Sequence, residues 1–291
     1  MKIRVGSRES RLAVIQSELA MAAIRAFDPS IETELVTMKT TGDRILDQTL
    51  DQIGGKGLFV KELDRALLDD VADITVHSLK DMPMETDPRL PIVAFSKRED
   101  PRDALVLPAG ETELNLQKPF GAASKRRALQ LQQLFPGCRV ELVRGNVQTR
   151  LSKLDSGQYG ALVLASAGLR RLGMMDRISR LFSVSEILPS AGQGTLSVQA
   201  RTDFDASVLQ KFHDADNKLV SLGERAFVRA LNGGCSSPVA AYAEISNGGI
   251  TITGLYVNAA QQLYYDQITG DKHEAERLGA LLAKRLKEER A

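Results

Sequence analysis

A cysteine with unusual neighbours is the first residue of this sequence that could do chemistry. Cys235 lies in "LNGGCSSP" (residues 231–238), between two glycines and two serines, with a proline soon after. No bulky side chain shields this thiol, and the glycines permit a sharp turn. A thiol of this kind can form a covalent bond to a ligand or substrate. These neighbours alone are compatible with two interpretations: Cys235 is either a buried structural cysteine or an exposed functional thiol.

A cysteine hydrolase is a poor explanation of this segment. Such an enzyme needs a basic partner for its thiol, and the sequence suggests no pairing with His77, His213 or His273. Pro238 also interrupts any helix that would begin at the nucleophile. The other cysteine, Cys138, starts an apolar run and is expected to pack as a small hydrophobic residue.

A carboxylate at a strand end is the second chemical candidate. The apolar strand in "ADITVHSLKDMP" (72–83) is followed by Ser78, Lys80 and Asp81. If it faces a crevice, Asp81 can stabilise a nearby cation and exchange protons with it. The alternative is a polar turn in which Asp81 satisfies backbone donors. His77 is expected to pack against the sheet.

Arginines recur where predicted strands end, and ligands of open α/β sheets bind at the carboxyl ends of strands. Guanidinium groups pair well with carboxylates and phosphates, so the set predicts a ligand with several anionic groups. Any single arginine could instead be a solvated charge at a helix start. The pairs are Arg8 and Arg11, Arg126 and Arg127, Arg144 and Arg150, and Arg170 and Arg171.

Alternating apolar runs and amphipathic segments predict that these residues are carried by an α/β protein with largely parallel sheets. "VGSRESRLAVIQ" and "FGAASKRRALQLQ" each pass from a strand through small residues into a helix, whose free N–H groups favour anions. In the first helix Leu12, Ile15, Leu19 and Ala23 are expected to form the core-facing stripe.

Two junctions divide the chain. Residues 99–119 are rich in proline and turn formers, and the pattern changes again near residues 213–227. After the second junction, antiparallel strands and a closing helix predict a smaller α+β domain that carries Cys235. "GGKGLFVKEL" (54–63) lacks the spacing of a phosphate loop and is expected to form a glycine-rich lid with Lys56 and Phe59.

The composition argues against several function classes. The 38 Lys and Arg residues balance 37 Asp and Glu residues, so no overall field favours nucleic acid or an anionic membrane. No apolar run reaches the roughly 20 residues that span a bilayer, and the first residues lack the pattern of a signal peptide. The two cysteines indicate neither a disulfide framework nor a metal site. We expect a cytoplasmic monomer without metal, nucleic-acid or membrane partners.

Eleven segments, in order along nearly the whole chain, together resemble the hydroxymethylbilane synthase family, also called porphobilinogen deaminase. They are "GSRESRLA", "GDRILD", "GGKGLFVKELD", "ADITVHSLKDMP", "REDPRDA", "SKRRALQL", "LVRGNVQTRLSKLD", "ASAGLRRLG", "PSAGQGTLSVQ", "ERAF" and "LNGGCSSP".

The resemblance implies that Cys235 holds one dipyrromethane cofactor per chain through a thioether. This cofactor is the primer to which four porphobilinogen units are added, each with loss of ammonia, before hydrolysis releases hydroxymethylbilane. It implies that Asp81 stabilises the cation formed by deamination and helps to move protons.

Family analogy also assigns binding roles. The cofactor would contact Ser78, Lys80, Asp81, Ser124, Arg126, Arg127, Arg144 and Arg150. The incoming or growing rings would contact Arg8, Ser10, Arg144, Arg150, Arg171 and Gln193.

The resemblance further implies an architecture of two domains like type II periplasmic binding proteins and a C-terminal α+β domain with a three-stranded antiparallel sheet. The expected boundaries are 1–95 plus 194–213, 100–190, and 217–291. Ala122 and Ala123 replace hydroxyl residues usual in the family, and Gln199 replaces an acid. A solute-binding or effector-sensing protein of the same architecture is the rival reading, and it would need neither Asp81 nor Cys235.

Overall fold

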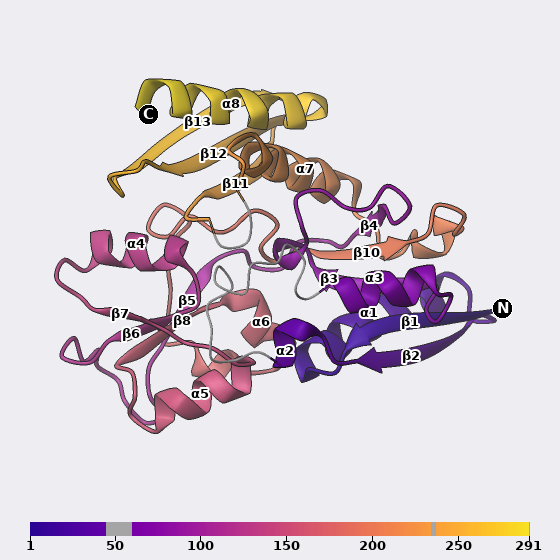
Figure 1. The fold of residues 1–291 in the computed structure, drawn as a ribbon, viewed down its shortest axis with the longest axis horizontal. Coiled ribbons are helices and arrows are strands. Elements are labelled where there is room, and N and C mark those ends of the chain that lie inside the picture. Colours follow the sequence, from indigo (N-terminus) through magenta and orange to yellow (C-terminus); the bar gives the residue numbers. More distant parts are fainter. Residues whose placement is uncertain (45–59, 234–236, 291) are drawn as a thin grey trace. The chain divides into compact units, whose positions relative to one another are not determined.

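The computed structural model describes residues 1–44, 60–233 and 237–290. The chain divides into two compact units. Unit 1 comprises Met1–Glu99 and Thr195–Lys218, and unit 2 comprises Asp100–Gly194 and Leu219–Ala291. The chain therefore passes between the units three times, at residues 99/100, 194/195 and 218/219. Figure 1 shows the elements of both units.

In its described residues, unit 1 contains one five-stranded sheet in the order β2-β1-β3-β10-β4. Strand β1 pairs in parallel with β2 and β3, whereas β10 runs antiparallel between β3 and β4. The strands are β1 (Lys2–Arg8), β2 (Glu32–Met38), β3 (Ile74–Ser78), β4 (Ile92–Phe95) and β10 (Leu196–Ala200). The helices are α1 (Arg11–Phe27), α2 (Thr41–Arg44) and α3 (Lys61–Leu68).

Unit 2 contains, in its described residues, a second five-stranded sheet in the order β7-β6-β8-β5-β9. Strand β6 pairs in parallel with β7 and β8, and β5 runs antiparallel between β8 and β9. The strands are β5 (Asp103–Val106), β6 (Phe120–Ala122), β7 (Val140–Leu142), β8 (Ala161–Ala165) and β9 (Arg180–Leu181). The helices are α4 (Lys125–Leu134), α5 (Val147–Asp155) and α6 (Ser166–Arg171).

The C-terminal part of unit 2 is an antiparallel sheet in the order β11-β12-β13 with helices packed on it. Helix α8 packs on β12 and β13 (Figure 1), and it crosses α7 so closely that a Cβ at Gly279 would lie 2.2 Å from the Gly223 carbonyl oxygen. The elements are α7 (Ala215–Ala230), whose first four residues belong to unit 1, β11 (Ala240–Ser246), β12 (Gly249–Val257), β13 (Leu263–Asp271) and α8 (Ala275–Arg290).

These sheets confirm the predicted fold class, an α/β protein with a C-terminal three-stranded antiparallel sheet. The two five-stranded sheets have matching orders, so β1 and β6 hold equivalent positions, each second from an edge. Both strands carry a glycine against a neighbouring side chain. A Cβ at Gly6 would lie 2.9 Å from Thr75, and one at Gly121 would lie 2.4 Å from Leu162. The similar opening of the two units predicted from sequence therefore reflects a repeated topology.

Alternating side chains build apolar clusters on both faces of the second sheet. Along β5, Ala104 and Val106 face one cluster, whereas Leu105 faces the other. This period of two is what a strand buried on both faces requires. The described helices include none that is long and apolar enough to cross a membrane.

The predicted stripe of helix α1 was wrong at Leu19, whereas Ala23 packs against the apolar cluster of the sheet, and Leu12 and Ile15 are half-buried. The buried residues are Ala13, Gln16, Ser17, Ala20, Met21 and Ile24, whereas Leu19 is 47% exposed. The periodicity argument selected residues that border the buried face and missed the residues at its centre. Small residues let the helix lie close to the sheet, and buried Gln16 donates a hydrogen bond to Ser78 Oγ (3.0 Å).

Candidate functional site

In unit 1, predicted site residues follow the carboxyl end of strand β1. Arg8 is the last residue of β1, and Ser10 is the N-cap of α1. The Ser10 hydroxyl accepts a hydrogen bond from the backbone N–H of Ala13 (3.4 Å). Ser10 forms this cap because its extended backbone turns its oxygen toward the unpaired N–H groups of the first turn. Arg11 is exposed in that turn.

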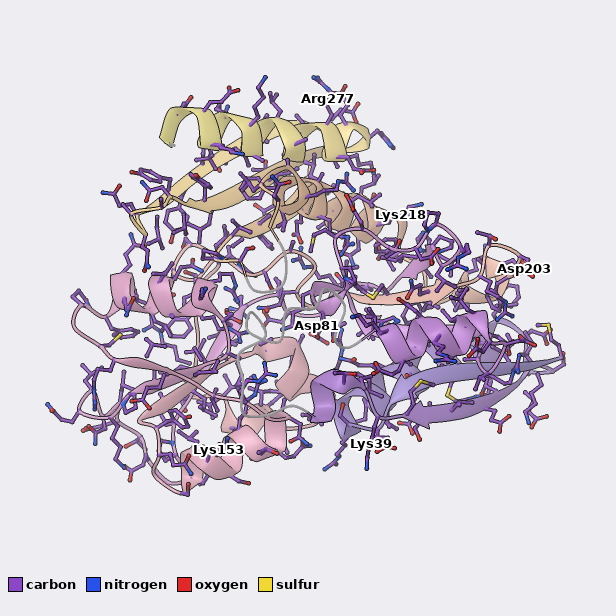
Figure 2. All side chains as sticks on the ribbon, in the orientation of Figure 1. Lys39, Asp81, Lys153, Asp203, Lys218 and Arg277 are labelled. Carbon is purple, nitrogen blue, oxygen red and sulfur yellow. The ribbon has the colours of Figure 1, made fainter. Side chains whose placement is uncertain are left out.

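A second group follows the neighbouring parallel strand β3. Ser78 ends the strand, and Lys80 and Asp81 lie half-buried in the 3-10 turn Leu79–Asp81 (Asp81 is labelled in Figure 2). The turn is fixed because the Leu79 N–H donates to the Thr195 carbonyl (3.0 Å). Within the described part of the chain, no hydrogen bond or ion pair engages the Asp81 carboxylate. Among the described residues, its oxygens therefore remain available to a ligand.

His77 is buried, as predicted, at 6% exposure. Its Nε2 atom lies 2.9 Å from the Thr75 hydroxyl. Burial, helped by the nearby charge of Arg8, lowers the pKa of His77 to about 3. The imidazole is therefore neutral at physiological pH and belongs to the packing of the sheet.

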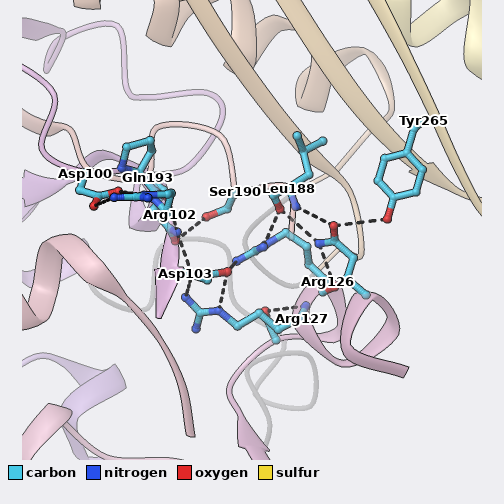
Figure 3. Close-up of polar contacts among 12 residues, drawn as sticks. Asp100, Arg102, Asp103, Arg126, Arg127, Leu188, Ser190, Gln193 and Tyr265 are labelled. Carbon is cyan, nitrogen blue, oxygen red and sulfur yellow. Dashed lines mark hydrogen bonds and ion pairs between the residues drawn. The ribbon is translucent and has the colours of Figure 1, made fainter. Parts of the chain in front are cut away.

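In unit 2, the arginine pair of α4 is held by an aspartate that the sequence argument did not single out. Asp103, the fully buried first residue of β5, accepts from Arg126 Nη2 (2.8 Å) and from Arg127 Nε and Nη2 (3.1 and 2.7 Å). Arg126 Nη1 also donates to the Leu188 carbonyl (2.6 Å). Figure 3 shows these contacts. Ser124 is the N-cap of this helix and accepts from the Arg127 N–H (3.4 Å).

The electrostatics of this cluster suit an anionic ligand. Burial alone would raise the pKa of Asp103, but the two guanidinium groups lower it well below its usual range. Burial lowers the pKa of Arg126 and Asp103 opposes that shift, so we assign an ionised state to both partners. Two guanidinium groups and one carboxylate leave one positive charge beside Ser124. The residues present therefore fit a group that carries carboxylates.

Other predicted arginines follow strands β7 and β8. Arg144 lies two residues after β7, and burial lowers its pKa. Arg150 Nε donates to the carbonyl of Gly145 (2.8 Å), whose φ of +109° suits glycine. Asn146 caps α5 by accepting from the Thr149 N–H (2.9 Å). Helix α6 follows β8 and ends at Arg171, which donates to the Gly194 carbonyl.

Gln193, expected to contact substrate, lies fully buried. Its Nε2 donates to Asp103 Oδ1 (2.8 Å) and to the Pro101 carbonyl (2.7 Å). The structure therefore places Gln193 in the same cluster as the arginine pair. The acid at the start of "DALVL" in an arginine-rich chain was the available signal for Asp103, because a buried acid needs cationic partners.

The predicted residues thus gather at the carboxyl ends of parallel strands in each unit. Unit 1 carries Arg8, Ser10, Ser78, Lys80 and Asp81. Unit 2 carries Ser124, Arg126, Arg127, Arg144, Arg150, Arg171 and Gln193. Cys235, Lys56 and Phe59 lie outside the described residues. Cys138, half-buried, packs against an apolar cluster as predicted.

Two family models match successive parts of the chain. The model described as "Porphobilinogen deaminase, dipyromethane cofactor binding domain" matches residues 3–209, and "Porphobilinogen deaminase, C-terminal domain" matches residues 218–288. Among solved structures, the effector binding domain of a BenM variant is 13% identical, with a TM-score of 0.42, and the match covers 72% of this chain and 90% of that one.

Curated relatives match over nearly their whole length. A porphobilinogen deaminase of Alkaliphilus oremlandii is 61% identical over 289 residues, covering 99% of this chain and 98% of the relative. That of Acetivibrio thermocellus is 60% identical over 283 residues, covering 97% of each chain. Together with the two family models, these identities place the chain in the porphobilinogen deaminase family.

Proposed function

We propose that the strand-end arginines of this chain bind the carboxylates of porphobilinogen and of its growing product, and that Asp81 moves the protons of the reaction. As a member of its family, the chain is a transferase of tetrapyrrole biosynthesis. It condenses four porphobilinogen molecules in succession, releases ammonia at each addition, and ends by hydrolytic release of hydroxymethylbilane. The observation that carries the residue roles is the gathering of arginines and capping serines at strand ends within each unit.

The arginines match the charge of the substrate. Each porphobilinogen ring brings an acetate and a propionate, so every addition adds two negative charges to the bound chain. Arg127, paired with Asp103 in a cluster of net charge +1, and half-buried Arg144 are suited to these carboxylates. Arg8, Ser10, Arg150 and Arg171 would bind further rings.

The dipyrromethane cofactor is a property of the matched family domain. When bound, it supplies the free pyrrole position to which the first porphobilinogen is joined. We propose that the Cys235 sulfur anchors it and that its carboxylates are held by Ser124, Arg126 and Arg127 in unit 2. By family analogy, Ser78 and Lys80 would also contact the cofactor.

Asp81 is assigned the proton chemistry because its half-buried carboxylate has no partner among the described residues. When the aminomethyl carbon–nitrogen bond of porphobilinogen breaks, ammonia leaves and positive charge develops on the ring nitrogen. An ionised carboxylate stabilises that charge. The same group can accept the proton released when the new carbon–carbon bond forms.

Intact-mass measurement of the purified protein tests the covalent anchor. The wild-type chain should exceed its polypeptide mass by one dipyrromethane, and Cys235→Ser should lack that excess. Cys138→Ser is the matched control and should keep it. A loaded Cys235→Ser chain would disprove the anchor, and an unloaded wild type would favour a binding module.

We further propose that the chain acts in the cytoplasm as a monomer, without a nucleic-acid or membrane partner. The balanced charge of the chain supports the absence of a nucleic-acid partner. We also propose that the chain has three domains, formed by residues 1–95 plus 194–213, 100–190 and 217–291.

A further inference from the structure

The buried carboxylate of Asp103 accepts hydrogen bonds from three side chains. It accepts four hydrogen bonds, from Arg126 Nη2, from Arg127 Nε and Nη2, and from Gln193 Nε2 (Figure 3). Three of these four hydrogen bonds are shorter than 3 Å, and the one from Gln193 (2.8 Å) is among them. Charged acceptors make the stronger hydrogen bonds in proteins. Asp103 therefore determines where both arginines and the Gln193 amide lie.

Gln193 connects this cluster to the two segments at which the chain enters and leaves unit 2. Its second acceptor, the Pro101 carbonyl, comes just after the passage at residues 99/100. Gln193 itself comes just before the passage at residues 194/195. Its amide thus fastens the entering and leaving segments to each other on the unit 2 side.

The leaving segment is fastened at neighbouring residues as well. Arg171 donates to the Gly194 carbonyl, and the Gly192 N–H donates to Glu224 of α7 (2.7 Å). Both Glu224 and Gln193 are fully buried. Residues 192–194 are therefore held by several contacts. A shift of the Gln193 side chain should move the backbone of this segment, because few other movements are open to it.

Arg126 donates to Asp103 and to the Leu188 carbonyl, and Arg127 donates to Asp103 through Nε and Nη2. A ligand carboxylate that pairs with Arg127 draws positive charge away from Asp103, and Asp103 then holds the Gln193 amide more strongly. We propose that Asp103 is a positioning residue that couples ligand charge at the arginine pair to the chain passages of unit 2. This inference rests on the proposed arginine roles and adds a link between them and Gln193.

A double-mutant cycle on the holoenzyme tests the coupling. The variants are Asp103→Asn, Gln193→Met and the double variant, with kcat and the number of rings bound during turnover as readouts, the latter by intact mass. Each single variant should lower kcat about tenfold or more, because each removes hydrogen bonds to a charged group. The double variant should be no slower than the slower single variant.

If the double variant lost kcat by the product of the two single-variant losses, the proposal would be overturned, because Gln193 would then act on the substrate independently of Asp103. A role in stability alone would lower the urea midpoint without changing the distribution of bound rings, which would also overturn it. Asp155→Asn is the matched control, since Asp155 pairs with Arg177 in unit 2 (2.8 Å) outside this cluster. Loss of the cofactor mass from the wild type would instead count against the proposed function.

If Asp103→Asn does not fold, Gln193→Glu and Gln193→Met provide the test. A carboxylate at residue 193 would repel Asp103 and compete for Arg127, so Gln193→Glu should lower kcat at least tenfold more than Gln193→Met. Equal kcat values for the two variants would contradict the coupling.

Discussion

At the scale of single residues, two aspartates show how environment decides chemistry. Asp103 is fully buried, and its pKa is held well below the usual range by two guanidinium groups. It stays ionised and cannot exchange protons near neutral pH. Asp81 is half-buried, and within the described residues it has no hydrogen-bond or ion-pair partner. Only the second environment suits a residue that must respond to charge developing on a substrate.

Asp81→Ala should therefore keep the fold and the cofactor mass but lower kcat at least about 100-fold, a typical loss for a group that moves protons. A porphobilinogen consumption assay measures kcat, and intact mass measures loading. Asp203→Ala is the control, since that side chain is 80% exposed and labelled in Figure 2 away from Asp81 in the same unit. Near-normal turnover of Asp81→Ala would remove Asp81 from its assigned role.

Burial of His77 predicts that the free energy of unfolding depends on pH. Its folded pKa of about 3 lies below the ordinary value of 6.5, so between these values the unfolded chain binds a proton that the folded chain excludes. The stability contribution is complete above pH 6.5 and is lost as pH falls toward 3. From pH 7 to pH 5 the free energy of unfolding should drop by about 2 kcal/mol through this residue.

Urea unfolding of the wild type and of His77→Gln at pH 7 and pH 5 measures this contribution. The variant should show the smaller drop, whereas His273→Gln, which changes an exposed histidine, should behave like the wild type. Burial also lowers the pKa of His213, which remains in both proteins and adds an equal background. Identical drops in wild type and His77→Gln would contradict the assignment.

Residue types alone located much of the candidate site. Arginine and serine at strand ends could be found in the sequence because small residues and helix starts mark those ends. The contacts of Gln193 could not be predicted, because they depend on Asp103 and Pro101, about ninety residues earlier. The importance of Asp103 was missed for the same reason, since its partners lie on a different element.

At the scale of elements, a polar N-cap recurs where site residues are placed. Ser10, Ser124 and Asn146 each accept a backbone N–H at the start of α1, α4 and α5. The cap fixes the first turn, which carries Arg11 in α1 and Arg126 and Arg127 in α4. The stripe of α1 shows the limit of pattern reasoning at this scale. Periodicity identified a helix, but it missed the small residues at the centre of the buried face.

Variants of Ser124 can separate the cap from ligand binding. Ser124→Ala should cost about 1 kcal/mol of unfolding free energy through loss of the cap. Ser124→Asp should retain that stability, because aspartate caps well and suits a helix N-terminus. Its charge should nevertheless repel ligand carboxylates and lower kcat/KM at least about tenfold.

Urea unfolding and steady-state kinetics check both expectations, with Ser124→Asn as the neutral capping control. Ser124→Asn should lose less activity than Ser124→Asp. Equal activity of these two variants would show that no anion binds beside Ser124.

At the scale of the whole molecule, the three chain passages are the dominant feature. On the unit 1 side one residue fastens the segments next to all of them. Asn217 Nδ2 donates to the Ser96 carbonyl (2.6 Å) and to the Thr195 hydroxyl (2.9 Å), and Asn217 itself lies just before residue 218. The sequence predicted junctions near these positions, but not that one buried amide joins them.

Asn217→Leu should lower the free energy of unfolding by about 2 kcal/mol, because it leaves a buried carbonyl and a buried hydroxyl without this donor. Urea unfolding measures the loss. Asn258→Leu, which removes an amide whose two hydrogen bonds to Gln262 are exposed to solvent, is the control and should change the midpoint less. A wild-type midpoint for Asn217→Leu would show that the passages are held by other contacts.

The order of strands also has a consequence for synthesis on the ribosome. Strand β10 lies between β3 and β4, yet it is encoded about a hundred residues after them. Residues 1–99 therefore emerge without the interior strand that joins β4 to the rest of their sheet, and at ordinary elongation rates they wait about 5 to 20 seconds for it. The inserted sheet of residues 103–181 has all its strands in one stretch and can close during that interval. The nascent amino-terminal part must consequently shield its apolar strands, by transient structure or by a chaperone, until residue 200 has left the exit tunnel.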